Sequence, residues 1–262
     1  ISMFGLYATL NADYLLSEGI VDHVLGADPG PELVGLAGSP ARAADPAGAA
    51  PVETLPSKRL RRPLSVLPYR GDLRPLARYV RLHDTGGRAK QVGYTETTRG
   101  CRHTCRHCPV VPVYQGRFFA TDARVVAADI AQLVVAGAEH ITFGDADFFN
   151  APKHALGIAR ALHSAHPHVT FDATVKVEHI VRHADAVAEL AALGLLFLVS
   201  AFESLDDRVL GYLHKGHQHS DALRALTIAR EAGVVLRPTF VAFTPWTTLA
   251  DYVALVLFVV ES

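Results

Sequence analysis

The three cysteines of the chain all fall within the eight residues CRHTCRHC, at 101–108. A disulfide-stabilised protein would use more cysteines and spread them along the chain, so this cluster is more typical of a metal site. The spacing C-x3-C-x2-C lets Cys101, Cys105 and Cys108 present three thiolates to one small inorganic group. An iron–sulfur cubane has four irons, so three protein ligands leave one iron open. An open coordination position is typical of a catalytic centre, and the pattern therefore indicates a catalytic iron–sulfur cluster.

Zinc is the other metal that these cysteines could bind. Structural zinc sites usually add a second, distant cysteine pair, which this sequence lacks, although His103 or His107 could supply a fourth ligand. Such a protein would be a zinc-stabilised binding module that uses the basic stretch from Lys58 to Arg81 to engage nucleic acid or an acidic partner. Three buried thiols without a metal are the remaining alternative.

Charge and composition exclude several classes of protein. The net charge of −1 gives no general attraction to nucleic acid or to an anionic membrane. No apolar run reaches the roughly 18 residues of a membrane-spanning helix, and no secretion signal is recognisable, so we expect a cytoplasmic protein without a membrane partner. Hydrophobic residues make up 50% of the chain, which excludes a disordered protein and allows a sizeable core.

The first 90 residues divide into two regions. Residues 1–36 alternate short apolar runs with helical patterns, as in an α/β piece: strands are predicted at 1–8 and 21–28, and helices at 11–19 and 29–37. Residues 37–90 are predicted to be a linker and a basic arm, because 13 of the 21 residues in 37–57 are Ala, Gly or Pro. The eight Lys and Arg of 58–81 predict a solvated arm and helix on the next domain, or a rim that attracts an anionic substrate.

Residues 91–262 show a regular alternation of strand and helix patterns. The predicted strands are 91–97, 140–145, 169–176, 195–202 and 234–243. The predicted helices are 120–138, 151–166, 182–194 and 220–233, with a last one beginning near 247. This alternation predicts a parallel sheet, and the lack of a GxGxxG turn favours a partial (β/α) barrel. Chemistry in such barrels lies at the carboxyl ends of the strands, where the cysteine loop follows the first strand.

The segment TRGCRHTCRHCPV, after a strand and before regular βα units, resembles the radical S-adenosylmethionine (SAM) superfamily. The resemblance implies a partial (β/α)6-type barrel in which Cys101, Cys105 and Cys108 hold a [4Fe-4S] cluster. The free iron would chelate SAM, whose reductive cleavage gives a 5′-deoxyadenosyl radical that abstracts a substrate hydrogen. The family usually has an aromatic residue before the third cysteine, and here His107 stands in that place. A barrel that has lost this activity is a further possibility.

Further SAM contacts are implied by the same resemblance. FGDADFF at 143–149 resembles the segment that binds the methionine ammonium, with Gly144 for close approach and Asp145 as the acid; alternatively, Asp145 or Asp147 caps the next helix. SAFESLDDRVLGYLHKGH at 200–217 resembles a segment of cobalamin-associated members of the family. The residues that it would contribute to SAM binding are Ser200, Glu203 and Ser204, unless Ser204 is a helix N-cap.

Two charged residues on other strands are also candidates. Lys176, at the end of the third strand, could contact SAM or substrate, or could pair with Glu178. Arg237 lies on a strand predicted to be buried, which requires a partner: SAM carboxylate, a substrate acid, or an Asp of a neighbouring strand.

The N-terminal piece resembles the last βα units of the Rossmann-like cobalamin-binding domain that precedes many radical SAM barrels, so cobalamin and methyl transfer are further expectations. The whole pattern resembles the radical SAM family named for a CUAEP or CCAEP tail, which is absent from this sequence. The resemblance implies a small-molecule or peptide substrate and an electron donor such as flavodoxin or ferredoxin. The chain starts without Met and stops inside an apolar helical pattern, so we expect a fragment that lacks the sixth strand.

Overall fold

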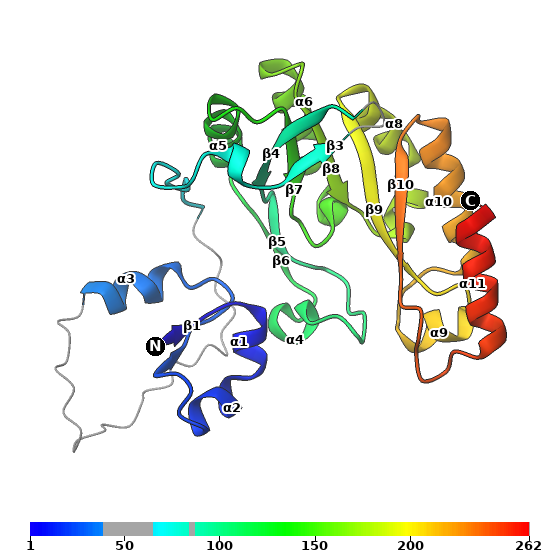
Figure 1. Cartoon of the computed structure of the whole chain (residues 1–262), viewed down its shortest axis with the longest axis horizontal. Coiled ribbons are helices and arrows are strands. Elements are labelled where there is room, and N and C mark those ends of the chain that lie inside the picture. The colour runs from blue at the N-terminus through cyan, green and yellow to red at the C-terminus, as the bar shows by residue number, and fades with distance from the viewer. Residues whose placement is uncertain (39–64, 84–86, 262) are drawn as a thin grey trace. The chain divides into compact units, whose positions relative to one another are not determined.

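The computed structural model describes residues 1–38, 65–83 and 87–261, which belong to two compact units (Figure 1). The first unit contains residues 1–64 and 102–117, and the second contains 65–101 and 118–262. The cysteine loop therefore contributes to both units, with Cys101 in the second and Cys105 and Cys108 in the first. Most of the predicted linker lies outside the described residues, whereas the part of the basic arm from residue 65 onward belongs to the second unit.

The first unit is a small α/β piece. Two strands, β1 (Ser2–Met3) and β2 (His23–Val24), pair in parallel. Its helices are α1 (Leu6–Leu10), α2 (Ala12–Ser17), α3 (Gly30–Gly38) and α4 (Val110–Tyr114). The predicted helices 11–19 and 29–37 are confirmed, but the strand predicted over 1–8 is wrong beyond residue 3. Gly5, with φ of 97°, turns the chain so that the following apolar residues form α1 instead.

A six-stranded sheet organises the second unit, in the spatial order β10-β9-β8-β7-β4-β3. The strands are β3 (Arg81–His83), β4 (Ala89–Thr95), β7 (His140–Phe143), β8 (Thr170–Thr174), β9 (Leu195–Glu203) and β10 (Val235–Phe240). Every pair is parallel except β3 with β4. The five strands predicted from the sequence are confirmed, and no strand of the described residues pairs with the outer edge of β10.

Helices follow the strands and pack on one face of the sheet (Figure 1). They are α5 (Ala123–Val135), α6 (Pro152–Ala165), α7 (Val177–Arg182), α8 (Ala184–Ala192), α9 (Asp207–Tyr212), α10 (His219–Glu231) and α11 (Leu249–Glu261). Two 3-10 turns lie at η1 (Leu76–Arg78) and η2 (Phe148–Asn150), and a short antiparallel pair, β5 (Thr98–Gly100) and β6 (Phe118–Ala120), flanks the cysteine loop.

The two faces of the sheet have different chemistry because side chains alternate along a strand. Ile141, Phe143, Phe171, Leu198 and Phe202 point toward the helices and form the buried core. The residues between them, which include His140, Thr142 and Asp172, lie on the opposite face, called here the interior face. A sheet covered by helices on one side, with a polar interior face, is the arrangement expected of a partial barrel.

The basic arm extends the sheet. Arg70 donates from Nε and Nη2 to the two carboxylate oxygens of the buried Asp129 on α5, at 2.6 and 2.8 Å. Its Nη2 also donates to the Tyr94 carbonyl, and the chain then forms β3 against β4. For Arg70, the prediction of an arm lying on the domain is therefore confirmed, and this guanidinium is not a free cation on a rim.

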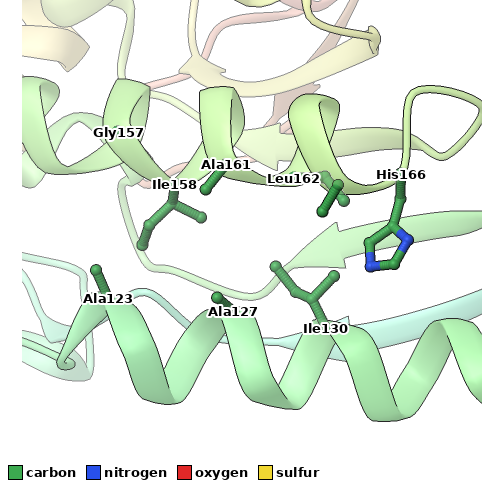
Figure 2. Close-up of a pocket in the computed structure, with 9 residues that line it drawn as sticks. Ala123, Ala127, Ile130, Gly157, Ile158, Ala161, Leu162 and His166 are labelled. Atoms are coloured by element: carbon green, nitrogen blue, oxygen red, sulfur yellow. The ribbon is translucent and has the colours of Figure 1, made fainter.

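A shallow apolar recess lies between α5 and α6 on the helix side (Figure 2). Small side chains, including Ala127, Gly157 and Ala161, leave this space between the two helices. The recess is lined by helix residues and not by strand ends, so it does not mark the predicted site. Within the described residues, no helix is long and apolar enough to span a membrane.

Candidate active site at the carboxyl ends of the strands

The three cysteines are thiols in the loop that follows β5. None forms a disulfide; Cys105 is buried, and Cys101 and Cys108 are partly exposed. The Cys108 amide donates to the Cys105 carbonyl at 3.2 Å, so the second and third cysteines share one turn. His107 is exposed in the same turn. The donor set is therefore chemically suited to a soft metal or a cluster, because cysteine thiolates are the ligands of iron–sulfur clusters.

Asp145 lies directly after β7 and holds the chain segment that leads to the cysteines. Its carboxylate accepts hydrogen bonds from the amide and hydroxyl of Thr97 and from the amide and hydroxyl of Thr98, at 2.6 to 2.9 Å. The side chain is buried, and this burial raises its pKa, against the opposing effect of the four hydrogen bonds. Both oxygens are thus engaged by protein donors.

Asn150 holds the next part of the same segment. Its Nδ2 donates to the Gly100 carbonyl at 3.2 Å, immediately before Cys101, and lies 3.4 Å from the Thr98 hydroxyl. Asp147 accepts from the Phe149 amide and lies 2.7 Å from His179 of α7. Of the two acids proposed as helix caps, Asp147 therefore caps η2, and Asp145 does not cap a helix.

Gly144 is covered by a tyrosine. A Cβ at this position would collide with the Tyr94 hydroxyl, so any larger residue would displace the ring. Tyr94 donates to Glu96 at 3.0 Å, and Glu96 also accepts from Arg99 at 3.1 Å. Burial and the Glu96 carboxylate raise the pKa of Tyr94, so its phenol stays protonated. Tyr94 thus approaches Gly144 closely, and the predicted approach of SAM to this glycine stays a prediction.

The carboxyl end of β8 carries an ion pair. Lys176 is buried and lies 3.3 Å from Glu178, while Glu178 also accepts from Arg182 at 2.7 Å. The pairing considered from the sequence is therefore confirmed, and it does not test a contact of Lys176 with SAM or substrate. Lys176 occupies the N-cap position of α7 without a side-chain capping hydrogen bond, and its ammonium is paired with Glu178 at the rim of the sheet.

The carboxyl end of β9 carries a second, more buried ion pair. Glu203 accepts from Lys215 at 3.1 Å, and the side chains are only 10% and 5% exposed. Glu203 has φ of 65°, a left-handed conformation that a residue with a side chain adopts only when its surroundings hold it there. The Val241 amide donates to its carbonyl, and the register of β9 and β10 shifts at this point. The backbone therefore turns so that the carboxylate meets Lys215.

The loop that contains Lys215 closes over the first ion pair. A Cβ at Gly216, whose φ is 74°, would lie 3.0 Å from the Glu178 carboxylate and 3.4 Å from the Lys176 ammonium. Burial, followed by the charges of Lys215 and Lys176, lowers the pKa of His217 to about 4. Two lysines and two glutamates thus lie together at the ends of neighbouring strands.

The two serines near the end of β9 lie in different surroundings. Ser204 is not a helix N-cap: Asp206 caps α9 by accepting from the Arg208 amide, and Ser204 itself accepts from the Asp206 amide. Ser200 is fully buried between Leu198 and Phe202, two residues of the core, and its contact with SAM stays a prediction. The bulge in β9 changes which residues face inward, and a simple alternation from the sequence does not show it.

Arg237 was predicted to lie on a buried strand, and this is wrong. It is exposed on β10, at the end of the sheet, with its guanidinium carbon 3.7 Å from the centre of the Phe197 ring. No carboxylate of the described residues pairs with it, so a neighbouring Asp is excluded there as its partner.

Sequence reasoning missed Lys215, Tyr94, Asn150 and the interior-face residues. Lys215 had a signal, since the KG dipeptide follows the ES segment, but its pairing with Glu203 depends on the left-handed turn. The other contacts join residues distant in sequence, and their side chains carry no local pattern.

Comparison with known proteins decides the family. The sequence profile of the Radical SAM superfamily matches residues 95–245. The chain belongs to the radical SAM superfamily. The match covers the strands and loops that carry every predicted residue of the site, and it confirms the family predicted from the cysteine motif. No curated protein is similar enough in sequence to be matched to this radical SAM chain.

Solved structures confirm the partial-barrel fold. The methyltransferase TsrM from Kitasatospora setae, with cobalamin and a [4Fe-4S] cluster bound, is 18% identical with a TM-score of 0.58, over 66% of this chain and 32% of that one. The cobalamin-dependent enzyme OxsB is 13% identical with a TM-score of 0.63, over 96% and 38%. Coproporphyrinogen III oxidase (HemN) from Escherichia coli is 14% identical with a TM-score of 0.50, over 66% and 42%. The radical SAM chain spans between 32% and 42% of these structures.

Proposed function

We propose that this chain is part of a radical SAM enzyme that holds a [4Fe-4S] cluster through Cys101, Cys105 and Cys108. The observation that carries the proposal is the set of three cysteine thiols in the loop after β5, none of them in a disulfide, inside the region that matches the family. When bound, the cluster supplies an electron and an open iron for SAM, whose cleavage gives a 5′-deoxyadenosyl radical that abstracts a substrate hydrogen.

The chain's own residues position the cysteine loop before any ligand binds. Asp145 holds Thr97 and Thr98 through four hydrogen bonds, and Asn150 holds the Gly100 carbonyl next to Cys101. A loop fixed at this end loses less conformational freedom when its thiolates take up iron. This arrangement supports a positioning role for Asp145.

The strand-end ion pairs are the groups that we propose for SAM. Glu203, held by Lys215 in a left-handed turn, would accept hydrogen bonds from SAM hydroxyl groups, and Ser204 lies next to it. Lys176 would attract the SAM carboxylate. We keep Gly144 and His107 as proposed neighbours of SAM, and a flavodoxin or ferredoxin as the proposed electron donor.

The test is anaerobic reconstitution of the chain with iron and sulfide. Wild-type protein should turn brown and hold about four irons, and Cys105→Ala should lose them, because two thiolates cannot retain the cluster. Thr104→Ala, in the same loop, is the matched control and should load normally. A colourless protein that takes up zinc but no iron would contradict the proposal and favour a zinc-stabilised binding module.

SAM binding is tested separately from iron binding. With dithionite and SAM, the loaded protein should release 5′-deoxyadenosine; cluster binding without release would indicate a barrel that has lost its activity. Glu203→Gln should weaken SAM binding while leaving the iron content intact. Unchanged SAM affinity in this variant would make Glu203 a structural residue.

We further propose cobalamin as a second cofactor of the protein, with methyl transfer as the coupled reaction. The parallel pairing of β1 and β2 in the first unit supports this, as does the alignment of 96% of the chain with OxsB, solved with aqua-cobalamin bound. Spectroscopic titration of the chain with hydroxocobalamin tests it, and an unchanged corrin spectrum would argue against this cofactor.

A further inference from the structure

The interior face of the sheet carries a chain of hydrogen bonds across three neighbouring strands. Lys90 of β4 donates to the Thr170 hydroxyl of β8 at 3.1 Å. That hydroxyl lies 2.8 Å from Nδ1 of His140, which is on β7. Nε2 of His140 lies 2.8 Å from Oδ1 of Asp172, again on β8. Since these side chains point away from the helices, the network faces the interior of the half-barrel.

Two of these hydrogen bonds have a fixed direction. An ammonium can only donate, so the Thr170 hydroxyl accepts from Lys90, and this hydroxyl also donates to the Glu139 carbonyl at 3.5 Å. A carboxylate can only accept, so Nε2 of His140 donates to Asp172.

Asp172 has acceptor capacity that the described residues do not use. The Thr142 hydroxyl also donates to Oδ1, at 2.6 Å, so both partners of this carboxylate reach the same oxygen. Oδ2 has no hydrogen bond to the described residues. A buried carboxylate with an unused oxygen is suited to a positively charged or hydrogen-bond-donating ligand.

A cation lies on the same face, over the strand that neighbours Asp172. Phe197 of β9 is the register partner of Asp172, and its ring stacks on His140 with centroids 5.9 Å apart. The guanidinium of Arg237 lies over the same ring, 3.7 Å from its centre. The guanidinium of Arg237 lies over β9, and β9 is adjacent to the strand that carries Asp172. Because adjacent strands are about 4.8 Å apart, one small molecule could contact both charges.

Arg237 is therefore placed to bind an anionic group. It is exposed and has no carboxylate partner among the described residues, and the ring below it fixes the plane of the guanidinium. A planar guanidinium presents two parallel N–H groups that match a carboxylate.

We propose that the interior face binds the enzyme's substrate through Arg237 and Asp172, and that this substrate carries both a carboxylate and an ammonium group, as amino acids do. The proposal rests on the proposed function, because it names the substrate class of the same half-barrel. It also assigns Arg237 to the substrate and not to SAM.

The experiment is saturation-transfer NMR on the reconstituted full chain, with a mixture of the twenty common amino acids as the probe. Each amino acid that binds is then compared with its amide and its N-acetyl derivative. Wild-type protein should bind the free amino acid at least about tenfold more tightly than either derivative, because each lacks one charge. Binding of none of the twenty, or equal binding of acid and amide, would overturn the proposal.

Variants assign each charge to its residue. Arg237→Gln should remove the preference for the acid over the amide, and Asp172→Asn should remove the preference for the amine over its N-acetyl form. Arg160→Gln is the matched control, because Arg160 lies on α6 and pairs with Glu189. Since Arg237 is exposed, its variant should fold normally even if Asp172→Asn disturbs the network. An Arg237→Gln variant that binds like the wild type would contradict the proposal.

A second readout separates this proposal from the proposed function. Arg237→Gln should keep its iron content and its affinity for SAM, since substrate alone contacts the guanidinium. Loss of SAM affinity would make Arg237 a SAM contact and overturn the assignment. If the wild type neither loads iron nor cleaves SAM, the proposed function fails, while the amino-acid binding measurement still decides this inference on its own.

Discussion

At the scale of single residues, the sequence predicted the position of Asp145 at a strand end, but not that its carboxylate binds the protein's own backbone and hydroxyl groups. Its position after a buried strand was predicted, but both oxygens are occupied by the amides and hydroxyls of Thr97 and Thr98. Burial without these donors would neutralise the acid, so the four hydrogen bonds make the loop and the carboxylate depend on each other.

Replacement of Asp145 by Asn tests whether this residue positions the loop or binds SAM. The amide nitrogen would face donors and leave buried N–H or O–H groups unsatisfied, so the free energy of unfolding should fall by about 2–4 kcal/mol. Urea denaturation measures this, with Asp185→Asn on the exposed start of α8 as the control, expected within about 0.5 kcal/mol of wild type. Unchanged stability together with lost SAM affinity would restore Asp145 as the ammonium ligand.

The serines of β9 show why a motif predicts position better than orientation. Ser200 and Ser204 lie in the segment that resembles the family, but the sequence alone does not reveal the bulge in β9 or the left-handed turn at Glu203. Ser200 consequently faces the core, and Asp206 takes the capping role. The local sequence pattern predicts that a residue lies at the end of a given strand. The face of the sheet to which its side chain points depends on how that strand pairs with its neighbours.

At the scale of elements, the arm from residue 65 onward completes the sheet that carries the site. Its basic composition predicted an arm on the domain, but not the antiparallel strand β3, because three residues without alternation carry no strand signal. The contact that fixes it is Arg70 with Asp129, whose side chain is only 3% exposed. The Thr95 hydroxyl donates to the same carboxylate and joins the arm, α5 and β4.

Removal of Arg70 should therefore detach the arm. Arg70→Ala leaves the buried Asp129 without its cation, and the free energy of unfolding should fall by about 3 kcal/mol. Limited proteolysis should also cut residues 65–83 earlier than in the wild type. Arg124→Ala, which breaks an exposed pair with Asp122, is the control and should cost no more than about 1 kcal/mol. Equal proteolysis of the Arg70 variant and wild type would show that β3 holds the arm by itself.

At the scale of the whole molecule, periodicity was enough to predict the five parallel strands of the sheet and the longer helices α5, α6, α8, α10 and α11, and the cysteine motif was enough to predict the family. The short elements between them, which are β5, β6, α4, α7 and α9, were not predicted. Each apolar strand is followed by an amphipathic helix, and such a chain has few ways to bury both. The pairing of Lys176 with Glu178, two residues away, could be considered from the sequence, but the buried ion pair of Glu203 with Lys215 could not be predicted. Glu203 and Lys215 are 12 residues apart in the sequence, and only the fold brings their charges together.

These buried charges also predict how the stability of the whole molecule depends on pH. His217 packs beside Lys215 and Lys176, with Asp221 as the nearby acid, and its folded-state pKa is lowered to about 4. In the unfolded chain the imidazole has an ordinary pKa of about 6.5, so between these values the unfolded state binds more protons than the folded state. Stability should therefore rise from pH 4 to pH 6.5 and level off above it.

Replacement of His217 by Gln should flatten that rise. The difference in unfolding free energy between pH 6.5 and pH 4 should shrink by about 1–2 kcal/mol, because Gln does not titrate in this range. Urea denaturation at half-unit pH intervals measures it, with His168→Gln, an exposed histidine in the turn after α6, as the control. If both variants keep the slope of the wild type, the lysines do not act on His217, and the two ion pairs are more open to water than their burial implies.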